Sequence, residues 1–294
     1  MSDRLCWGVY REVAHSPGRE TDDAEILRAT AENLAALGFR TELKTPDELP
    51  GIRDAAGVPP NLFVMCERTS VVERLAAWAR RGVRVVNRPD AIRNTDRQRT
   101  LDRFERHAVA FPETVLVETG PNAARKPLSL EPPCWVKRGD VHATDPGDVS
   151  YAGSAAEIAG ALARLSARGI SRAVVQRHVP GDLIKFYGVG GEPGAPLSWF
   201  QWFYHRDQKL SNHPFDPDEL RDLVQRGAAA LGLEVFGGDA IVGVGGRMVL
   251  IDLNAWPSFA LFRDVAARRI AECLADRFAR DAAPRFAGEL EVPR

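Results

Sequence analysis

The first ninety residues alternate between short apolar runs and longer stretches in which apolar residues recur at helical spacing. The short runs at 5–10, 40–45, 61–66 and 83–87 have the length and flanking residues of buried strands. Residues 24–38 and 71–82 place apolar side chains three and four positions apart, which predicts helices. Because strands that alternate with helices indicate parallel βαβ units, we predict a small open α/β domain over residues 1–88.

Capping signals predict where several helices begin. Ser70 precedes Glu73 by three positions, and Ser154 precedes Glu157 in the same way, which are capping-box patterns. Asp216 is followed by Pro217, a typical N-cap and first helical residue. The apolar pattern then predicts helices at 91–107, 157–169, 219–233 and 262–281, strands at 111–118, 134–140, 172–182, 183–191 and 197–207, and a mobile loop at 139–147 with a flap extending to 153.

A β-hairpin is predicted over residues 235–255, where two apolar runs flank Gly245 and Gly246. Asp239 lies six residues before Gly245, and Asp252 lies six residues after Gly246. A two-residue turn would therefore place the two carboxylates nearly opposite each other. Asn254 follows Asp252 by two positions, so both side chains project from the same face.

Three oxygen-bearing side chains on one hairpin face repel one another and are costly to desolvate unless a cation lies between them. Mg²⁺ typically binds one or two carboxylates, together with water and phosphate oxygens. The hairpin is therefore consistent with a magnesium–nucleotide site. The alternative is an exposed strand face with solvated acids.

The chain has 294 residues and a net charge of −1, so bulk charge favours neither nucleic acid nor an anionic membrane as a partner. The four cysteines, Cys6, Cys66, Cys134 and Cys273, lie far apart without a CxxC pair, which favours reduced thiols in a cytoplasmic protein. No apolar run approaches the roughly 18 residues of a membrane span, and the N-terminal residues lack a signal-peptide pattern.

Four segments resemble motifs of the ATP-grasp superfamily and occur in the order found there: VVNRPDAIRNTDRQRTL, PCWVKRGD, QRHVPGD, and FGGDAI with LIDLNAWPSF. The last is similar to the form seen in inositol trisphosphate 5/6-kinases and in relatives of the ribosomal-protein glutamate ligases. The resemblance implies an α/β ATP-grasp fold with a pre-ATP-grasp domain at 1–88, a small lobe at 89–180, a large lobe with the metal site at 181–285, and a tail at 286–294.

The resemblance also implies roles for individual residues. Arg97 and Lys137 would contact ATP phosphates, the backbone from Gln176 through Arg177 and His178 to Val179 would bind adenine, and Asp182 would lie near the ribose. One or two Mg²⁺ ions would bind Asp239, Asp252 and Asn254, while His142 and Lys185 would face the acceptor. Arg177 and His178 depart from the usual residues of this motif, and the ligases usually have Glu in place of Asp252. Without the resemblance, Arg97 is consistent with a solvated helix surface, His142 with a surface loop, and Lys185 with an edge strand.

Three functions are compatible with these residues. A carboxylate–amine ligase would transfer the ATP γ-phosphoryl group to a carboxylate, and an amine would then attack the acyl phosphate. A kinase would phosphorylate a hydroxyl, which Asp252, Asn254 and His142 favour. A non-catalytic nucleotide-binding scaffold would have no use for all the charged groups. We favour the ligase, with a small-molecule acceptor and an amine as partners.

Overall fold

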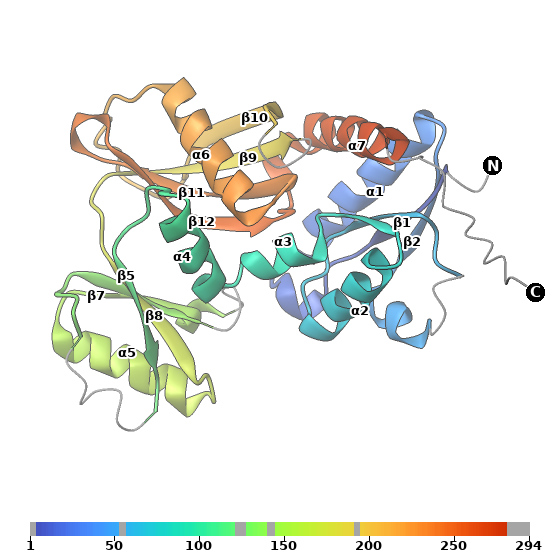
Figure 1. Cartoon of the computed structure of the whole chain (residues 1–294). Helices are drawn as coiled ribbons and strands as arrows, with labels where there is room; N and C mark the ends of the chain where they lie inside the picture. The colour runs from blue at the N-terminus through green and yellow to red at the C-terminus, as the bar shows by residue number, and fades with distance from the viewer. Residues whose placement is uncertain (1–3, 53–56, 121–127, 140–144, 191–194, 281–294) are drawn as a thin grey trace, which may run out of the picture.

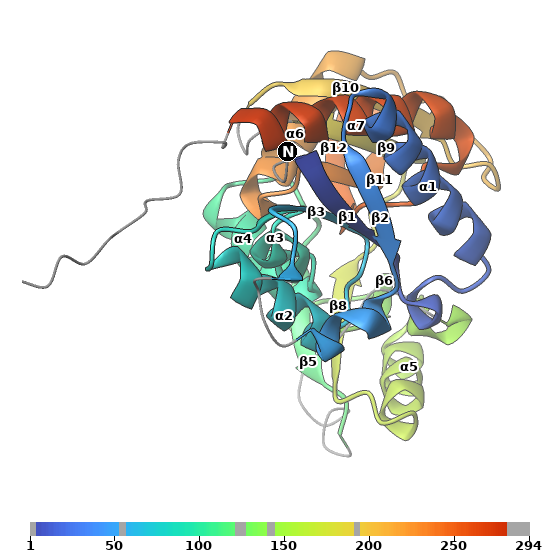
Figure 2. The ribbon, with the colours of Figure 1, turned by 90° about the vertical axis from the view of Figure 1, so that its right-hand side faces the viewer.

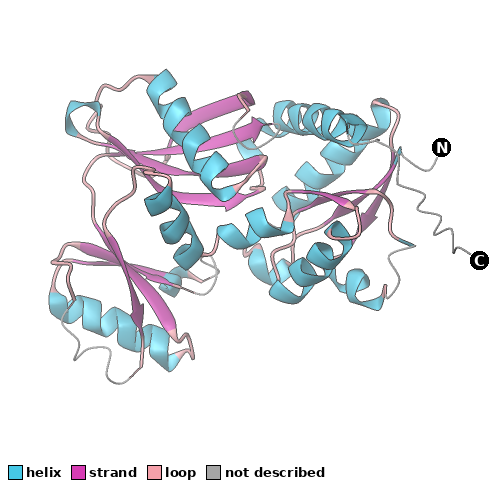
Figure 3. Cartoon of the chain, in the orientation of Figure 1, coloured by secondary structure: helices cyan, strands magenta, loops and turns pink. Residues whose placement is uncertain are grey.

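The computed structural model describes residues 4–52, 57–120, 128–139, 145–190 and 195–280, and among these the strands form three four-stranded sheets (Figures 1 and 3). The first sheet has the strand order β2-β1-β3-β4 and is entirely parallel, as the βαβ pattern predicts. Its elements are β1 (Leu5–Val9), α1 (Glu20–Ala36), β2 (Arg40–Lys44), β3 (Asn61–Val64), α2 (Thr69–Ala79) and β4 (Arg84–Val86).

The other two sheets are antiparallel. The second has the order β5-β8-β6-β7, and the third has the order β10-β9-β11-β12. The second sheet consists of β5 (Thr114–Glu118), β6 (Cys134–Arg138), β7 (Val149–Ala152) and β8 (Arg172–Arg177), and helix α5 (Ala155–Ala167) packs against it. The third sheet consists of β9 (Asp182–Gly190), β10 (Leu197–Tyr204), β11 (Val235–Val242) and β12 (Met248–Ala255), and helix α6 (Pro217–Leu231) packs against it. Strand β7 forms the last part of the predicted flap at 139–153, and its residues 149–152 pair with β6. Residues 140–144 of the predicted flap lie outside the described residues.

The predicted helix at 91–107 is two helices, α3 (Pro89–Asn94) and α4 (Arg97–Arg106). Asp96 leaves the helical conformation, and its side chain accepts a hydrogen bond from the Gln98 N–H at 3.0 Å. An aspartate that caps a helix in this way starts a new helix, so the apolar periodicity across the break was misleading. Arg97 consequently begins α4.

Two of the three capping predictions are confirmed. Ser154 accepts from the Glu157 N–H, and Asp216 accepts from the Asp218 N–H. The capping box predicted at Ser70 is wrong, because α2 begins at Thr69 without a side-chain cap from its preceding residue. Instead, the buried carboxylate of Glu12, distant in sequence, accepts from the N–H groups of Glu67 and Arg68 at the start of this helix.

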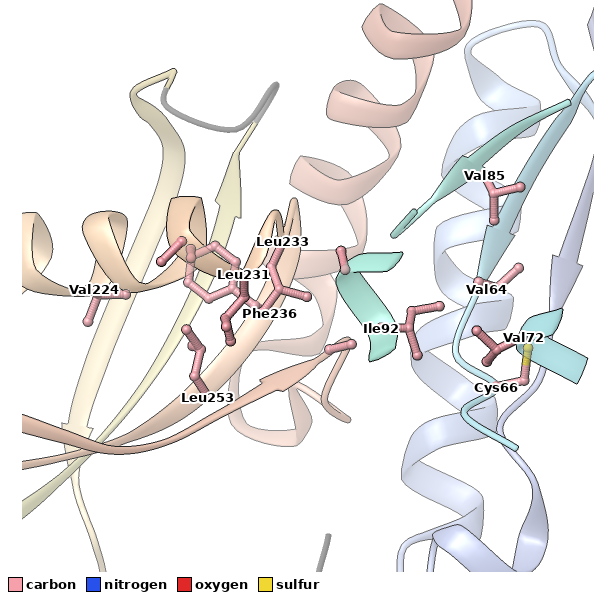
Figure 4. Close-up of a cluster of buried hydrophobic side chains, with 14 of the residues drawn as sticks. Val64, Cys66, Val72, Val85, Ile92, Val224, Leu231, Leu233, Phe236 and Leu253 are labelled. Atoms are coloured by element: carbon pink, nitrogen blue, oxygen red, sulfur yellow. The ribbon is translucent and has the colours of Figure 1, made fainter. Parts of the chain in front are cut away.

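Two buried apolar clusters join the first sheet to the third. Helix α7 (Arg263–Arg280) packs beside α1 and against β9 and β10 (Figures 1 and 2). In the other cluster, Ile92 of α3 lies between Val64, Val72 and Val85 on one side and side chains of α6 and β11 on the other (Figure 4). The predicted domain boundaries stay a prediction, with α3, α4 and α7 packing across them.

All four cysteines are buried, and the structure contains them as thiols rather than disulfides. Within the described ranges, no helix combines the length and the apolar character that crossing a membrane requires.

Candidate functional site

The hairpin of β11 and β12 brings Asp239 opposite Asp252, which confirms the predicted pairing. The predicted two-residue turn is wrong, because residues 243–247 connect the strands and Val242 pairs with Met248. If the pairing of Val242 with Met248 continued without interruption along the two strands, Asp239 would lie opposite Ile251. An irregularity between Asp239 and Ala240 restores the pairing with Asp252 by leaving Ile251 as an extra residue in β12.

The acids of this hairpin are held by polar neighbours. The Asn254 Nδ2 donates to Asp252 Oδ2 at 3.0 Å, and the Lys185 Nζ donates to Asp239 Oδ1 at 2.8 Å. Burial raises the pKa of Asp239; the Lys185 ammonium opposes this rise and the Asp252 carboxylate adds to it. Two carboxylates that raise each other's energy in this way favour a bound cation. In the described part of the chain, no three His, Cys, Asp or Glu side chains are grouped to hold a metal, so a cation here would bind two carboxylates, an amide and non-protein oxygens.

Lys137 reaches from the second sheet to the third. Its buried Nζ donates to Gln176 Oε1 at 2.8 Å and to the Ile251 carbonyl at 3.4 Å. The carbonyl that Lys137 contacts thus belongs to the extra residue of the bulge. Burial lowers the pKa of Lys137 to about 8, Asp252 and Asp239 oppose this change, and Arg97 reinforces it. A buried ammonium of this kind has a strong tendency to bind an anion.

A small pocket lies where these groups meet. Arg97, Lys137, Gln176, Ile251 and Asp252 line it, together with Thr95, Thr100, Leu101, Phe111, Thr114 and Val174. The Arg97 guanidinium donates to the Arg138 carbonyl, which follows Lys137 in β6. The structure therefore gathers two cationic side chains and a carboxylate around a partly apolar cavity, an arrangement suited to a nucleotide with its phosphates and a cation.

The segment predicted to bind adenine lies at the end of β8. Gln176 is buried and donates to Thr114 Oγ1 at 3.2 Å. The N–H groups of Arg177 and His178 donate to the carbonyls of Glu113 and Pro133, and the His178 Nδ1 accepts from the Trp135 indole at 3.2 Å. In the described ranges the Val179 N–H makes no hydrogen bond, so it is the donor of this segment left for a purine.

One predicted residue does not join this cluster. Asp182 is almost fully buried, and its two oxygens accept from the Ser211 and His213 N–H groups at 2.6 and 2.8 Å. It therefore holds the loop before α6. The predicted ribose contact is wrong, because the carboxylate is buried and both of its oxygens accept from backbone N–H groups. His142 lies outside the described residues, as does the tail at 286–294.

Sequence reasoning missed Ile251, which contacts Lys137 through its carbonyl and lines the pocket. A signal was present. Residues 248–251 before Asp252 are all apolar, which departs from the alternation expected of a regular strand, although it does not by itself identify the extra residue.

Gly238→Ala is expected to lower the free energy of unfolding by about 1–3 kcal/mol. A Cβ at Gly238 would lie 2.2 Å from the Asp252 carbonyl oxygen and 2.7 Å from the Phe186 ring, so the hairpin would have to shift. Urea denaturation measures the effect. Gly160→Ala in α5 is the control: its Cβ approaches only the flexible Arg164 guanidinium, at 3.5 Å, and helix propensity predicts a gain of about 0.5–1 kcal/mol. Wild-type stability of Gly238→Ala would contradict the close packing of β11 on β12.

Solved structures resemble this chain over nearly its whole length. A RimK domain ATP-grasp protein from Sphaerobacter thermophilus DSM 20745 matches with a TM-score of 0.65 and 20% identity, covering 92% of this chain and 99% of that one. D-alanine–D-alanine ligase from Bacillus anthracis complexed with ATP matches with a TM-score of 0.66 and 11% identity, covering 94% and 97%. The chain has the ATP-grasp fold.

A third ATP-grasp structure is that of the ligase PsnB complexed with a minimal precursor, Mg and ADP, with a TM-score of 0.64, 17% identity, and coverage of 94% of this chain and 97% of that one. No protein-family model matches the chain, and neither does any curated protein. The likeness to solved structures confirms the fold predicted from the four motifs.

Proposed function

We propose that this ATP-grasp protein is an ATP- and Mg²⁺-dependent ligase that joins a carboxylate to an amine through an acyl phosphate. The observation that supports this most is the position of Lys137, which spans two sheets and interacts electrostatically with both Asp239 and Asp252. A cation near phosphates and an acid pair near a divalent ion are the groups that phosphoryl transfer requires. The similar structures include ligases, one with ATP and one with Mg and ADP.

In this proposal, individual residues of the chain would have different roles. Arg97 and Lys137 would bind phosphate oxygens, and the Val179 N–H would bind the purine edge. Asp239, Asp252 and Asn254 would hold Mg²⁺, which supplies positive charge to the phosphates during transfer. Lys185 would orient the acceptor carboxylate, since its ammonium already lies 2.8 Å from Asp239. Because the phosphoryl-transfer transition state is loose and anionic, positioning and charge are sufficient and no protein nucleophile is needed.

A hydroxyl kinase is the second candidate, favoured by Asp252 in a position where the ligases usually have Glu. Incubation with ATP, Mg²⁺, hydroxylamine and a panel of carboxylates and alcohols distinguishes the two. The ligase predicts hydroxamate and ADP in equal amounts, with neither product in the absence of ATP. A phosphorylated alcohol without hydroxamate from any acid would reject the ligase and establish the kinase.

ATP binding is expected to weaken as pH rises above 8. The nucleotide-free protein has a Lys137 pKa of about 8, so this side chain is charged below that pH and increasingly neutral above it. Bound phosphates favour the ammonium, so binding at pH 9 takes up a proton, and the Kd for ATP rises toward tenfold per pH unit. Calorimetry in two buffers of different ionisation enthalpy measures the proton uptake. Lys137→Met should abolish it, and an equal uptake in that variant would assign the proton to another group.

A further inference from the structure

The face of the third sheet that carries Lys185 also carries partly exposed aromatic side chains. Lys185 and Tyr187 are two residues apart in β9 and share a face, and Phe203 of β10 pairs directly with Lys185. The opposite face of the same strands packs against α6, with Phe186, Phe200 and Trp202 in or against that core. The aromatic residues beside Lys185 are therefore on the side away from the core around α6.

Tyr187, Phe203 and Phe262, here termed the aromatic wall, contact one another. The ring centroids of Tyr187 and Phe203 are 5.5 Å apart, those of Phe203 and Phe262 are 5.7 Å apart, and those of Tyr187 and Phe262 are 6.3 Å apart. Phe262 comes from the 3₁₀ helix Ala260–Phe262, which follows β12. All three side chains are partly exposed, and Phe203 and Phe262 belong to none of the buried clusters. Tyr187 also packs against the buried cluster that contains Phe259, whose ring centroid lies 4.7 Å away, so the three rings form a partly open surface at the edge of that core.

The aromatic wall is continuous with the charged site. Lys185, which pairs with Phe203 in the neighbouring strand, donates a hydrogen bond to Asp239. Burial raises the pKa of the Tyr187 phenol; Arg19 opposes this rise, and Asp239 and Asp22 add to it, so the phenol lies among charges from both the hairpin and the first sheet. The exposed Arg19 belongs to the connection between β1 and α1, and its Nη1 lies 3.5 Å from Ser258 Oγ. Arg19 is therefore a second cation, besides Lys185, that interacts with the aromatic wall.

We propose that the acceptor is a carboxylate that carries an aromatic ring, with its reacting carboxylate at Lys185 and its ring against Tyr187, Phe203 and Phe262. This rests on the proposed ligase function. Two residues along a strand span roughly 6.6 Å, which suits an acid whose ring is separated from its carboxylate by two or three bonds. Aromatic side chains in contact bind another ring at its face or edge, and this favours a planar ring over a saturated one of the same size. Arg19 would receive a second anionic or carbonyl group of the acceptor.

Binding of matched acids tests the proposal without requiring turnover. The probes are 3-phenylpropanoate and both enantiomers of phenylalanine, each compared with its cyclohexyl counterpart, in the presence of Mg²⁺ and a non-hydrolysable ATP analogue. Saturation-transfer NMR is expected to show at least one aromatic acid binding about fivefold or more tightly than its cyclohexyl counterpart. Phe203→Leu is expected to reduce that binding about tenfold and leave the affinity for the ATP analogue unchanged. Tyr204→Leu, the next residue of β10 but on the opposite face, is the control and should retain the preference.

The outcomes separate this proposal from the ligase function. Equal binding of aromatic and saturated acids, or a preference that Phe203→Leu leaves intact, would overturn the proposal and show the aromatic wall to be structural only. In the hydroxylamine assay, hydroxamate from aliphatic acids but not from aromatic acids would also overturn it while the ligase stands. Conversely, ring-selective binding that depends on Phe203, without hydroxamate from any acid, would support the subsite and reject the ligase.

Discussion

Asp252→Asn is expected to lower the rate of ADP formation roughly a thousandfold while the protein stays folded. The Asp252 carboxylate lies opposite Asp239 and accepts from Asn254, so it is the negative charge that a cation shared with Asp239 would contact. A carboxamide has nearly the same shape but lacks this charge. The substitution also removes a like charge from beside Asp239, so the thermal unfolding midpoint of the variant should not fall below that of the wild type. ADP release and thermal unfolding measure the two effects.

Asp222→Asn is the matched control, because Asp222 lies on the exposed side of α6 and is distant in sequence from the hairpin. It should change neither quantity. Asp239→Asn should reproduce the loss seen for Asp252→Asn. Wild-type turnover in either hairpin variant would show that the acid pair does not hold the cation that phosphoryl transfer requires.

Lys137→Met is expected to change activity and stability in opposite directions. ADP formation should fall roughly a hundred- to a thousandfold, because a buried cation that would contact the phosphates is lost. The free energy of unfolding at pH 7 should rise by about 1–3 kcal/mol, since burial lowers the pKa of Lys137 to about 8 and the charged form is therefore costly in the folded state. Steady-state kinetics and urea denaturation measure these changes.

The pH dependence gives the stability effect a second test. Below pH 8 the side chain is protonated in both the folded and the unfolded protein, so the cost of burying its charge is fully present. Between pH 8 and the ordinary lysine value of 10.5 the folded state loses its proton first, and the wild type becomes more stable relative to the variant. The advantage of Lys137→Met should therefore shrink over this range. Lys209→Met, at an exposed lysine, should show neither effect, and a constant advantage from pH 7 to 10 would contradict the linkage to Lys137.

Local patterns predicted much of the fold because their causes are local. Apolar spacing located the strands and helices of the first sheet, and an aspartate or serine that can bond an amide two or three residues ahead located the starts of α5 and α6. The same reasoning failed for α2, where the carboxylate that receives the N–H groups belongs to Glu12 in another part of the chain. It failed for α3 and α4 because periodicity continues through a break that Asp96 creates.

The sequence by itself determined which residues can do chemistry here: two acids and an amide spaced about a glycine turn, a lysine near the end of a strand, and four motifs in the order that the ATP-grasp fold requires. Only the tertiary structure decided how they meet. The sequence predicted Asp239 opposite Asp252 across a two-residue turn, but the strands reach this pairing through a longer connection and the bulge at Ile251. The approach of the second sheet lets Lys137 contact the Ile251 carbonyl. The tertiary structure also shows that Asp182 accepts hydrogen bonds from backbone N–H groups and that Phe203 pairs with Lys185. Strand register and the approach of separate sheets depend on contacts between residues far apart in the chain, and a local pattern does not encode those contacts.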